Sequence, residues 1–458
     1  MASTAATGRR LRLGAFLYPT GHHVAARRHP GAQADAASNF AHYVHLARVA
    51  ERGRFDMLFL ADSAAAPAGS AERLSRNPRS VSFEPLTLLS ALAAVTTNIG
   101  LVATVTTTYN EPYHVARKFA SLDQISGGRS GWNLVTSANA EEALNFGREA
   151  HPAHPDRYDR AREFAEVVLG LWDSWDDDAF VRDKASGRFF DPAKLRVLHH
   201  RGRHFQVRGP LNVPRSPQGR PVLVQAGSSE DGKDLAAETA EVVFTAHQTL
   251  EDATAFCRDL KGRMAGRGRD PDSLKVMPGV FPVIGRTAQE AEDRFGLLQE
   301  LIHPEIGLGL LSNMIGHDLT GLDPDGPLPA LPESNQGKSR ADLLVRLAGR
   351  EGLTVRQLWM RIAGARGHRQ IRGTPAQIAD QMQEWFEAGA ADGFNVMPPY
   401  LPGALEGFVE LVMPELRRRG LFREEYEAAT LRGNLGLERP ASRFFAGGAA
   451  APAAVAAE

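Results

Sequence analysis

Residues 126–139, SGGRSGWNLVTSAN, hold a turn, a short apolar run and a group of small polar side chains in direct succession. Residues 126–128 interrupt the helix-like pattern before them, because successive glycines do not continue a helix. Residues 130–136 are mostly apolar and short, as in strands that are buried on both faces of a parallel sheet. Ser137 and Asn139 follow directly. The stretch therefore predicts a core strand that brings polar groups to one edge of a sheet.

The same alternation of strand and helix recurs along the chain. Further apolar runs, each followed by an amphipathic helical pattern, occupy residues 11–17, 55–61, 99–107, 221–227, 241–247, 274–285 and 392–399. With residues 130–136 they give eight strand–helix units, which is the number that closes into a (β/α)8 barrel. A doubly wound open sheet is the alternative, but its Gly-rich dinucleotide fingerprint follows none of the predicted strands. The prediction is an α/β fold of the TIM-barrel type.

The chain is longer than a barrel requires. Its 458 residues exceed the usual size of a (β/α)8 barrel, so roughly 200 residues belong to insertions or tails. We predict one barrel domain over residues 11–438, with insertions near 62–82, 174–219 and 296–372 at the carboxyl face. Residues 1–10 are expected to be flexible. The Ala/Pro/Gly-rich residues 439–458 are expected to be a disordered tail, above all beyond Phe445.

Charge and composition exclude several classes of partner. Lys and Arg number 53 against 54 Asp and Glu, so no basic surplus indicates nucleic acid or an anionic membrane. The longest apolar run, residues 86–95, is shorter than the ~20 residues that span a bilayer, and the N-terminus lacks the apolar stretch of a secretion signal. The single cysteine, Cys257, excludes an intrachain disulfide. It lies on the apolar face of a predicted helix and is expected to pack in the core. These features predict a cytoplasmic protein.

Polar side chains follow most of the predicted strands. In a (β/α)8 barrel the carboxyl ends of the strands meet at one face, where ligands bind. That face would receive Tyr18, His22, His23, Asp62, Ser63, Thr104, Thr106, Thr107, Thr108, Tyr109, Asn110, Asn133, Thr136, Ser137, Asn139, Gly227, Ser228, Ser229, His247, Gln248 and Asn395. Hydrogen-bonding groups dominate this set, and it contains neither paired carboxylates nor a lysine nucleophile. Such a mouth suits a large polar cofactor that carries the reaction chemistry itself.

Two short motifs are candidates for a phosphate site. In QAGSSEDG, residues 225–232, a strand ends in Gly-Ser-Ser before a helix, whose free N–H groups and dipole favour a phosphate. Ser228 with Asp231 equally suits a plain capping box. His154 and Tyr158 lie four residues apart at a predicted helix start, so an imidazole and a phenol would share one face. A solvated helix start remains the alternative for this pair.

The histidine-rich segments do not indicate a metal site. Residues 21–30, GHHVAARRHP, contain His22, His23 and His29, but adjacent histidines diverge and partner carboxylates are lacking. Residues 198–204, LHHRGRH, are expected to form a solvated loop. We therefore predict no metal.

Six stretches resemble one known family. Residues 13–30, 55–63, 106–137, 154–175, 222–244 and 373–399 together resemble the nitrilotriacetate monooxygenase family of the bacterial-luciferase-like superfamily. That family also includes dibenzothiophene-sulfone and long-chain-alkane monooxygenases. The likeness extends in order over roughly residues 11 to 438.

The resemblance implies a two-component enzyme. Reduced FMN would come from a separate NAD(P)H:FMN reductase, react with O2 as a flavin C4a-(hydro)peroxide and oxygenate a small organic substrate, often with C–N or C–S cleavage. A homodimer or homotetramer is implied. The alternatives are a hydride-transfer oxidoreductase that uses flavin or deazaflavin, a non-catalytic flavin-binding protein, and a metal-dependent barrel hydrolase. The block SGGRSGWNLVTS argues against hydride transfer.

The resemblance also implies roles for individual residues. The cofactor contacts would be Asp62, Thr106, Thr107, Asn133, Val135, Ser137, His154, Tyr158, Ser228 and Ser229. His22 or His23 would be the acid/base near the reacting oxygen, because imidazole titrates near neutral pH. Tyr109, Asn110 and His317 are weaker candidates, and His317 lies on the insertion expected to act as a lid. Arg27 stands where relatives often carry Trp, which favours an anionic substrate if the position borders the pocket rather than solvent.

Overall fold

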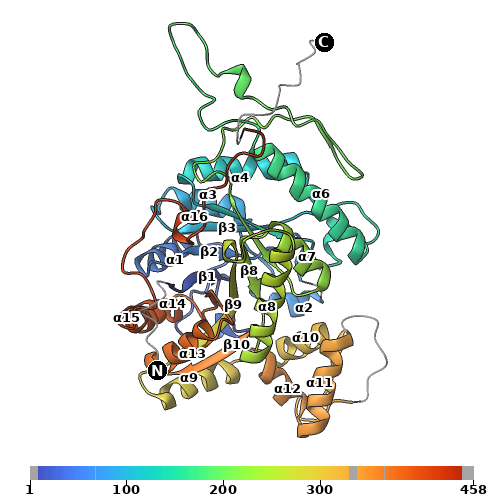
Figure 1. Ribbon diagram of the computed structural model, residues 1–458. Coiled ribbons are helices and arrows are strands. Elements are labelled where there is room, and N and C mark those ends of the chain that lie inside the picture. Colours follow the sequence, from blue (N-terminus) through green and yellow to red (C-terminus); the bar gives the residue numbers. More distant parts are fainter. Residues whose placement is uncertain (1–8, 68, 138, 330–337, 366, 446–458) are drawn as a thin grey trace.

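A computed structural model describes residues 9–445 except 68, 138, 330–337 and 366. Eight parallel strands form its centre (Figure 1): β1 (Arg12–Leu17), β2 (Met57–Leu60), β3 (Gly100–Thr106), β4 (Ser130–Val135), β7 (Val222–Ala226), β8 (Val242–Thr245), β9 (Lys275–Ile284) and β11 (Gly393–Val396). β8 pairs with β9, and β9 leads through β11 back to β1, so the sheet closes on itself. The predicted (β/α)8 barrel is confirmed, and each of the eight barrel strands lies within its predicted range.

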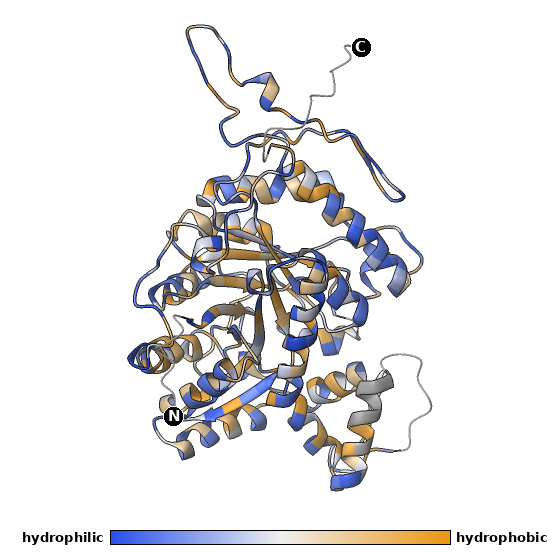
Figure 2. Ribbon diagram, viewed as in Figure 1, coloured by the Kyte–Doolittle hydropathy of each residue, from blue (hydrophilic) through white to orange (hydrophobic). Residues whose placement is uncertain are grey.

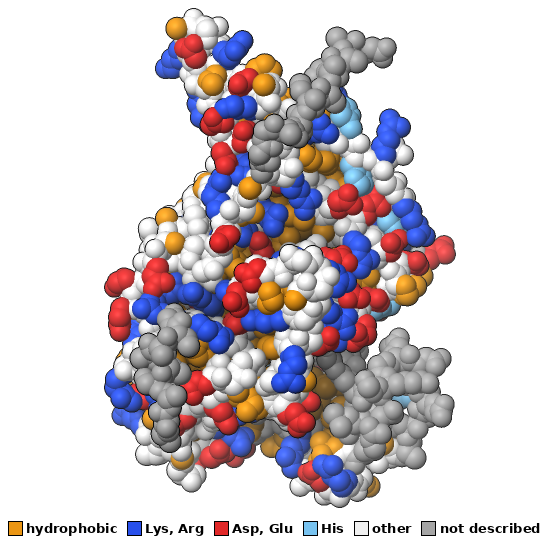
Figure 3. Space-filling model, in the orientation of Figure 1, with side chains coloured by type: hydrophobic (Ala, Val, Ile, Leu, Met, Phe, Trp, Pro, Cys, Tyr) orange, Lys and Arg blue, Asp and Glu red, His pale blue; other side chains and the backbone are white. Residues whose placement is uncertain are grey.

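Helices cover the outside of the barrel. They are α1 (Phe40–Arg52), α3 (Pro85–Ala93), α4 (Pro112–Ser126), α6 (His154–Trp172), α7 (Glu230–Thr239), α8 (Leu250–Gly266), α9 (Ala288–Glu300), α13 (Pro375–Glu387), α14 (Gly403–Gly407) and α15 (Met413–Arg418), with a π-helical turn over Phe408–Val412. Figure 2 shows apolar strands inside and hydrophilic outer faces on the helices. Basic and acidic side chains are mixed over the face in Figure 3. None of the helices in the described chain could cross a membrane.

Strand β4 explains the stretch that begins with SGGRSG. Trp132 points outward, with its ring 6.0 Å from that of Phe119 on α4 and 5.8 Å from that of Phe164 on α6. Because side chains alternate along a strand, Asn133 points into the barrel, where its Nδ2 donates to Thr104 Oγ1 at 2.8 Å. Both faces are buried. The outer face of β4 also carries Ser130, whose hydroxyl donates to Asp123 Oδ1 on α4 at 2.8 Å, and Asn133 is the polar residue on the inner face.

The first half of that stretch closes the amino end of the barrel. Gly127 ends α4 in the left-handed conformation with φ 68°. The buried guanidinium of Arg129 donates to the carbonyl oxygens of Ala93 at 3.0 Å and Ile99 at 2.8 Å. A short helix near the carboxyl terminus, α16 (Leu431–Asn434), places Leu431 in the barrel core. The sequence reading did not anticipate this plug, because nothing local to residues 431–434 indicates the cavity that they fill.

The excursion before β7 is a projecting arm, drawn in green at the top of Figure 1. It contains η3 (Pro192–Lys194) and the antiparallel pair β5 (His200–Arg201) and β6 (Gln206–Val207). Residues 199 and 201–203 are exposed, as the expected solvated loop requires, but the segment also pairs as strands, and His200 Nε2 lies 3.0 Å from Glu163 Oε1 and His204 Nε2 2.9 Å from Asp159 Oδ2. Both carboxylates belong to α6, so the arm is attached to the barrel.

Part of the predicted tail is packed. Arg439 forms an ion pair with Asp177, and Arg215 donates to the Pro440 carbonyl at 2.7 Å. Residues 446–458, where disorder was predicted most strongly, lie outside the described residues, as do residues 1–8 of the predicted flexible N-terminus.

The segment before β11 carries a small helical unit with its own core. It comprises α10 (Pro304–Ile315), α11 (Lys338–Glu351) and α12 (Val355–Ile362), packed around Trp359 and Leu311. A further strand, β10 (Arg369–Gly373), pairs in parallel with the end of β9 beyond the barrel. It was not predicted, because RQIRG is too polar and too short for the apolar pattern. Arg73 on α2 (Ala71–Ser75) donates to the Gly309 carbonyl at 2.8 Å, so α10 contacts the loop after β2.

Cys257 is expected to resist thiol reagents in the folded protein. Its side chain is buried on α8, and burial followed by the charge of Asp392 raises the pKa of the thiol to about 12. At neutral pH almost no reactive thiolate is present. Mixing with a chromogenic disulfide should label Cys257 only after unfolding in guanidinium, and fast stoichiometric labelling of the native protein would contradict the buried placement.

Candidate functional site

Aromatic rings and unpaired amides lie inside the carboxyl half of the barrel. The rings of Phe16, Phe59 and Phe244 contact one another with centroids 4.9 to 5.5 Å apart. The Oδ1 of Asn133 and both amide atoms of Asn395 are buried without a hydrogen-bond partner. Buried polar groups are nearly always paired. These amides therefore indicate a place where a ligand or water completes the hydrogen bonding.

The loops after β2, β3 and β4 join in a hydroxyl network around a buried carboxylate. Ser137 Oγ lies 2.7 Å from Thr106 Oγ1 and 2.6 Å from Glu142 Oε2. Ser63 Oγ donates to Glu142 Oε1 at 3.0 Å. Glu142 is 3% exposed at the start of α5 (Glu142–Asn145). Sequence reasoning missed it, because it follows the strand end by seven residues within an unremarkable acidic pair.

The backbone at Ser137 is held in an uncommon conformation. Its φ is 49°, a left-handed value that non-glycine residues adopt rarely. Arg157 on α6 donates to the Thr136 carbonyl at 3.1 Å and also to the Ser137 carbonyl. This contact ties the strained turn to the helix that carries Tyr158. Arg157 was also missed, since no local pattern marks it.

The ends of β7, α6 and α7 form a polar cradle. The Ser229 hydroxyl lies 3.4 Å from the Tyr158 hydroxyl and accepts from the Gly232 N–H at 3.1 Å. A Cβ on Gly232 would lie 3.2 Å from the Tyr158 oxygen, so a side chain there would crowd the cradle. The capping box of Ser228 with Asp231 is wrong, because Ser229 is the N-cap of α7. Ser228 is exposed in front of the helix.

The two helix starts also meet. α6 begins at His154, whose ring lies 4.8 Å from that of Tyr158, as the four-residue spacing predicts. His154 Nδ1 is 3.3 Å from Asp231 Oδ2 on α7. Two positive helix ends therefore point to the same polar surface, which favours an anion there.

The neighbouring histidines after β1 diverge. His22 is fully buried, with its Nε2 2.8 Å from the Phe16 carbonyl and its ring edge-on to those of Phe16 and Tyr18. His23 Nδ1 accepts from the Ala25 N–H at 3.1 Å. Burial lowers the pKa of His23 to about 3, and the neighbouring Gln299 side chain opposes this shift only in part. His23 is therefore neutral at physiological pH, and His22 is the histidine beside the aromatic floor formed by Phe16, Phe59 and Phe244.

The other predicted residues are more dispersed. Asp62 is exposed at the mouth, where partial desolvation and then the charge of Glu84 raise its pKa to about 6. Tyr109 donates to or accepts from His151 Nδ1 at 2.6 Å, and desolvation raises the pKa of the phenol. The Thr107 hydroxyl donates to the Val135 carbonyl at 3.2 Å.

Three further predicted residues lie away from the cradle and from the hydroxyl network around Glu142. Arg27 is exposed on the short helix η2 (Ala26–Arg28), which fits the solvent-facing reading as well as a pocket rim. His317 is half-buried in the turn after α10, on the helical unit. Asn110 Nδ2 donates to the Thr106 carbonyl at 2.9 Å and so supports the strand end.

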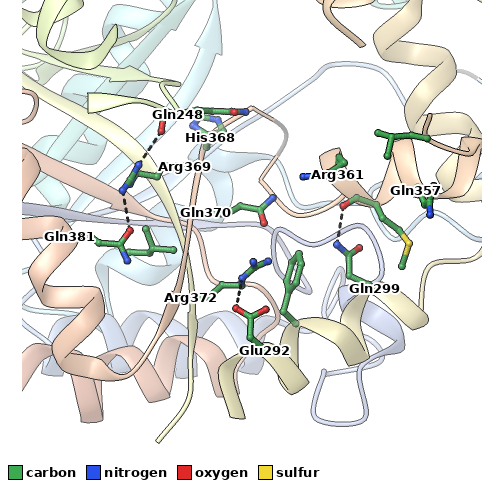
Figure 4. A pocket seen from close by; sticks show the side chains of 14 residues that line it. Gln248, Glu292, Gln299, Gln357, Arg361, His368, Arg369, Gln370, Arg372 and Gln381 are labelled. Atoms are coloured by element: carbon green, nitrogen blue, oxygen red, sulfur yellow. Dashed lines mark hydrogen bonds and ion pairs between the residues drawn. The ribbon is translucent and has the colours of Figure 1, made fainter. Parts of the chain in front are cut away.

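A cleft of about 810 Å³ lies between the barrel rim and the helical unit (Figure 4). Its wall includes His368, whose ring stacks on Phe244 at 4.9 Å and so connects the cleft to the barrel interior. Arg369 donates to the Gln248 carbonyl and to Gln381 Oε1, each at 3.0 Å, and Arg372 pairs with Glu292. The side chains of Figure 4 are largely amides and guanidinium groups, drawn from β10, α9, α12 and α13. Of this wall the sequence predicted only Gln248 at the mouth, and Arg361, Arg369 and Arg372 were missed because they belong to residues 296–372, which were interpreted only as an insertion.

Within the described chain, no three His, Cys, Asp or Glu side chains gather as metal ligands would. The arrangement instead offers an anion cradle beside β7 and a hydroxyl-lined rim over β2 to β4. These two features lie on adjacent strands, because β4 pairs with β7.

Comparisons with known proteins agree with this geometry. The family model of the luciferase-like monooxygenases matches residues 19–392. The chain is 52% identical to the N-acetyl-S-(2-succino)cysteine monooxygenase of Bacillus subtilis (strain 168), over 95% of this chain and 98% of that protein. It is 53% identical to nitrilotriacetate monooxygenase component A of Aminobacter aminovorans, over 94% and 97%. The crystal structure of a riboflavin lyase with modified FMN and riboflavin matches with a TM-score of 0.83 and 34% identity, over 95% and 98%.

The family match spans most of the chain, and both curated relatives align over nearly their whole length. The resemblance found in the sequence is therefore confirmed, and with it the classification as a monooxygenase. The chain belongs to the luciferase-like monooxygenase family.

Proposed function

We propose that the chain is the oxygenating component of a two-component system that uses reduced FMN to insert one atom of O2 into a small organic substrate. A separate NAD(P)H:FMN reductase would supply the reduced flavin, in line with the relative that is named as component A. The observation that carries the proposal is the cradle of Tyr158 and Ser229 at two helix starts, next to the hydroxyl rim of β2 to β4. FMN would place its phosphate dianion in the cradle and the long polar edge of its tricyclic ring along the hydroxyl rim.

The residues present fit FMN. Tyr158, Ser228, Ser229 and His154 would hold the phosphate, where two helix dipoles favour negative charge. Gly232 leaves room that a side chain would fill, with a Cβ only 3.0 Å from Ser229 Oγ. Thr106 and Ser137, with Asp62 nearby, would line the ring edge, and the unpaired Asn133 amide oxygen offers an acceptor below it. Asn133, Val135 and Thr107 would complete this side of the pocket.

When bound, reduced FMN supplies the electrons that activate O2. The chain's own part is to exclude water and to hold protons. The aromatic floor of Phe16, Phe59 and Phe244 and the helical unit over the rim restrict solvent. A carbonyl only accepts, so the 2.8 Å contact of His22 Nε2 with the Phe16 carbonyl requires the proton on Nε2. Neutral His22 therefore has Nδ1 as an acceptor, and it donates from Nδ1 only as an imidazolium.

Replacing His22 by Ala is expected to uncouple the reaction. Loss of a positioned acid/base costs ~10²-fold or more in such steps, so more of the oxygen should leave as free H2O2 while FMN affinity is kept. Measurements of H2O2 released per electron pair, with FMN binding in parallel, check this.

The matched variant is His23→Ala. Because the pKa of His23 is about 3, its side chain does not titrate where the enzyme works. We expect an unchanged pH profile between about pH 5 and pH 9. Peroxide release that is unaltered in both variants would remove the acid/base role from this pair.

The substrate proposed is a small molecule that carries carboxylates. It would enter through the cleft of Figure 4, whose wall contains Arg361, Arg369 and Arg372. Two of these cations are partly neutralised by Glu351 and Glu292, which favours a few carboxylates over a highly charged ligand. Nitrilotriacetate and N-acetyl-S-(2-succino)cysteine, named for the two relatives above, are both polycarboxylates. Arg27 would add to this preference only if it borders the same path.

Mass spectrometry of products tests the whole proposal. The purified chain, free reduced FMN and O2 are incubated with panels of aminocarboxylates, carboxylated thioethers, sulfones and alkanes. We expect a gain of one oxygen, or a carbonyl fragment, from the carboxylated members. Oxygen consumption that ends only in H2O2 for every compound would indicate a non-catalytic flavin protein. Substrate reduction without oxygen uptake would indicate hydride transfer.

A further inference from the structure

Glu142 has no assigned role, yet it lies among the hydroxyl groups of the proposed ring site. Both carboxylate oxygens are occupied, one by Ser63 at 3.0 Å and the other by Ser137 at 2.6 Å. Ser63 follows β2 and Ser137 follows β4, so Glu142 joins two loops that are far apart in sequence. Its charge also contributes to the raised pKa of Asp62 and of Tyr109 at the same rim.

The positions of the hydroxyl protons follow from counting donors. An ionised carboxylate only accepts hydrogen bonds, and a hydroxyl has one proton to give. Ser63 and Ser137 therefore donate to Glu142. Ser137 has then no proton left for its 2.7 Å contact with Thr106 Oγ1, so Thr106 donates to Ser137. The hydroxyl protons of Ser63, Ser137 and Thr106 are therefore all directed along the network toward Glu142.

The outer ends of the network then offer lone pairs only. Thr106 Oγ1 already accepts from the Thr108 N–H at 3.1 Å, and Ser63 Oγ accepts from Asn139 Nδ2 at 3.2 Å. Thr106 points into the barrel mouth, two residues beyond Thr104 on β3, and is half-buried. Its remaining lone pair can only accept from a ligand. A group opposite Thr106 must carry an N–H or O–H.

We propose that Glu142 is a positioning residue that orients the hydroxyls of Ser63, Ser137 and Thr106 as acceptors, so that the rim selects the imide N–H edge of the flavin ring. The inference rests on the proposed function, since it assumes that FMN lies over β2 to β4. It adds a specific source for the orientation of the ring: a buried carboxylate that contacts the ring only through other side chains.

The test compares oxidised FMN with N3-methyl-FMN, which lacks the imide proton. Loss of one hydrogen bond of about 1 kcal/mol corresponds to ~5-fold in Kd, so the wild type should prefer FMN by about that factor or more. Glu142→Gln places a donor amide in the network: Ser137, accepting from this amide, then donates to Thr106, and the Thr106 proton becomes free for the ligand. The preference of this variant for FMN should fall close to onefold. Glu141→Gln removes the neighbouring, exposed carboxylate and should keep the wild-type preference.

A second variant covers the case in which Glu142→Gln does not fold. Ser137→Ala breaks the path from Glu142 to Thr106 but leaves the carboxylate and Ser63 paired, and it should reduce the preference to the same extent. Equal loss of affinity for both flavins in these variants, with the preference retained, would make Glu142 a structural residue and overturn the proposal. Failure of the wild type to bind FMN at all would instead refute the proposed function.

Discussion

FMN binding is expected to weaken by about 3–6 kcal/mol when Tyr158 is replaced by Phe and Ser228 by Ala in one chain, since each loses a charge-assisted contact of about 1.5–3 kcal/mol to a phosphate dianion. In dissociation constants this is a loss of ~10²-fold to 10⁴-fold. Tyr158 already faces Ser229 across the cradle at 3.4 Å, so its hydroxyl is oriented before any ligand arrives.

Fluorescence quenching of FMN, titrated at fixed ionic strength, measures this effect. Ser229 is left intact, because it caps α7 and its removal would cost about 1 kcal/mol of helix stability. The matched control is Tyr426→Phe. In the wild type the Tyr426 hydroxyl donates to the Phe55 carbonyl at 2.8 Å, and Phe55 precedes β2 at the amino end of the barrel, away from the cradle. Equal affinities in wild type, control and double variant would move the phosphate away from this cradle.

The second large effect concerns stability at the opposite end of the barrel. Glu241 precedes β8, is buried, and accepts from Arg432 at 2.7 and 2.9 Å and from the Leu223 N–H at 3.0 Å. Glu241→Gln removes the charge and leaves the buried guanidinium of Arg432 uncompensated. Breaking a buried pair in this way costs about 3–5 kcal/mol, and it should loosen the α16 plug first.

Chemical denaturation of the wild type and the variant checks this value. Glu238→Gln is the control: it removes a nearby carboxylate of α7 that pairs with Arg162 at the surface, where one ion pair is worth about 0–1 kcal/mol. A Glu241→Gln protein as stable as the control would show that the pair contributes nothing.

The same residue gives a pH dependence. Burial alone would raise the pKa of Glu241, but the charges of Arg432 and Arg220 outweigh it and lower the pKa to about 2. The carboxyl of an unfolded chain titrates near pH 4.3. The folded value is the lower one, so the stabilisation is complete above that pH and is lost as pH falls toward 2. Wild-type stability should drop by about 3 kcal/mol over this window, and the Glu241→Gln variant should lack that part of the drop.

Local pattern was sufficient for the barrel and for the cradle. The apolar runs at residues 99–107 and 221–227 could only be buried on both faces, and the helical pattern after each left a parallel sheet as the arrangement. Tyr158 and Ser229 were found because their signals are local: a helix start with i, i+4 spacing, and a strand that ends in Gly-Ser-Ser before a helix. The error at Ser228 was one residue in a helix boundary.

Glu142, Arg157 and His368 could not be found in this way. Each takes its role from a partner on another loop: Glu142 from Ser63, 79 positions earlier, Arg157 from the carbonyl of Thr136, and His368 from Phe244. A carboxylate, a guanidinium or an imidazole in a loop has no periodicity to read, and its charge alone does not tell whether it is solvated or buried.

The sequence by itself determined the eight-strand barrel, because periodic burial can be recognised within each strand and helix. It also determined the family, through six stretches that resemble it in order along the chain. Only the tertiary structure decided which polar groups meet, which of His22 and His23 faces the aromatic floor, and how residues 431–434 close the amino end. The physical reason is that hydrogen-bond direction and burial are set by neighbours in space, which chain closure brings together from strands far apart in the sequence.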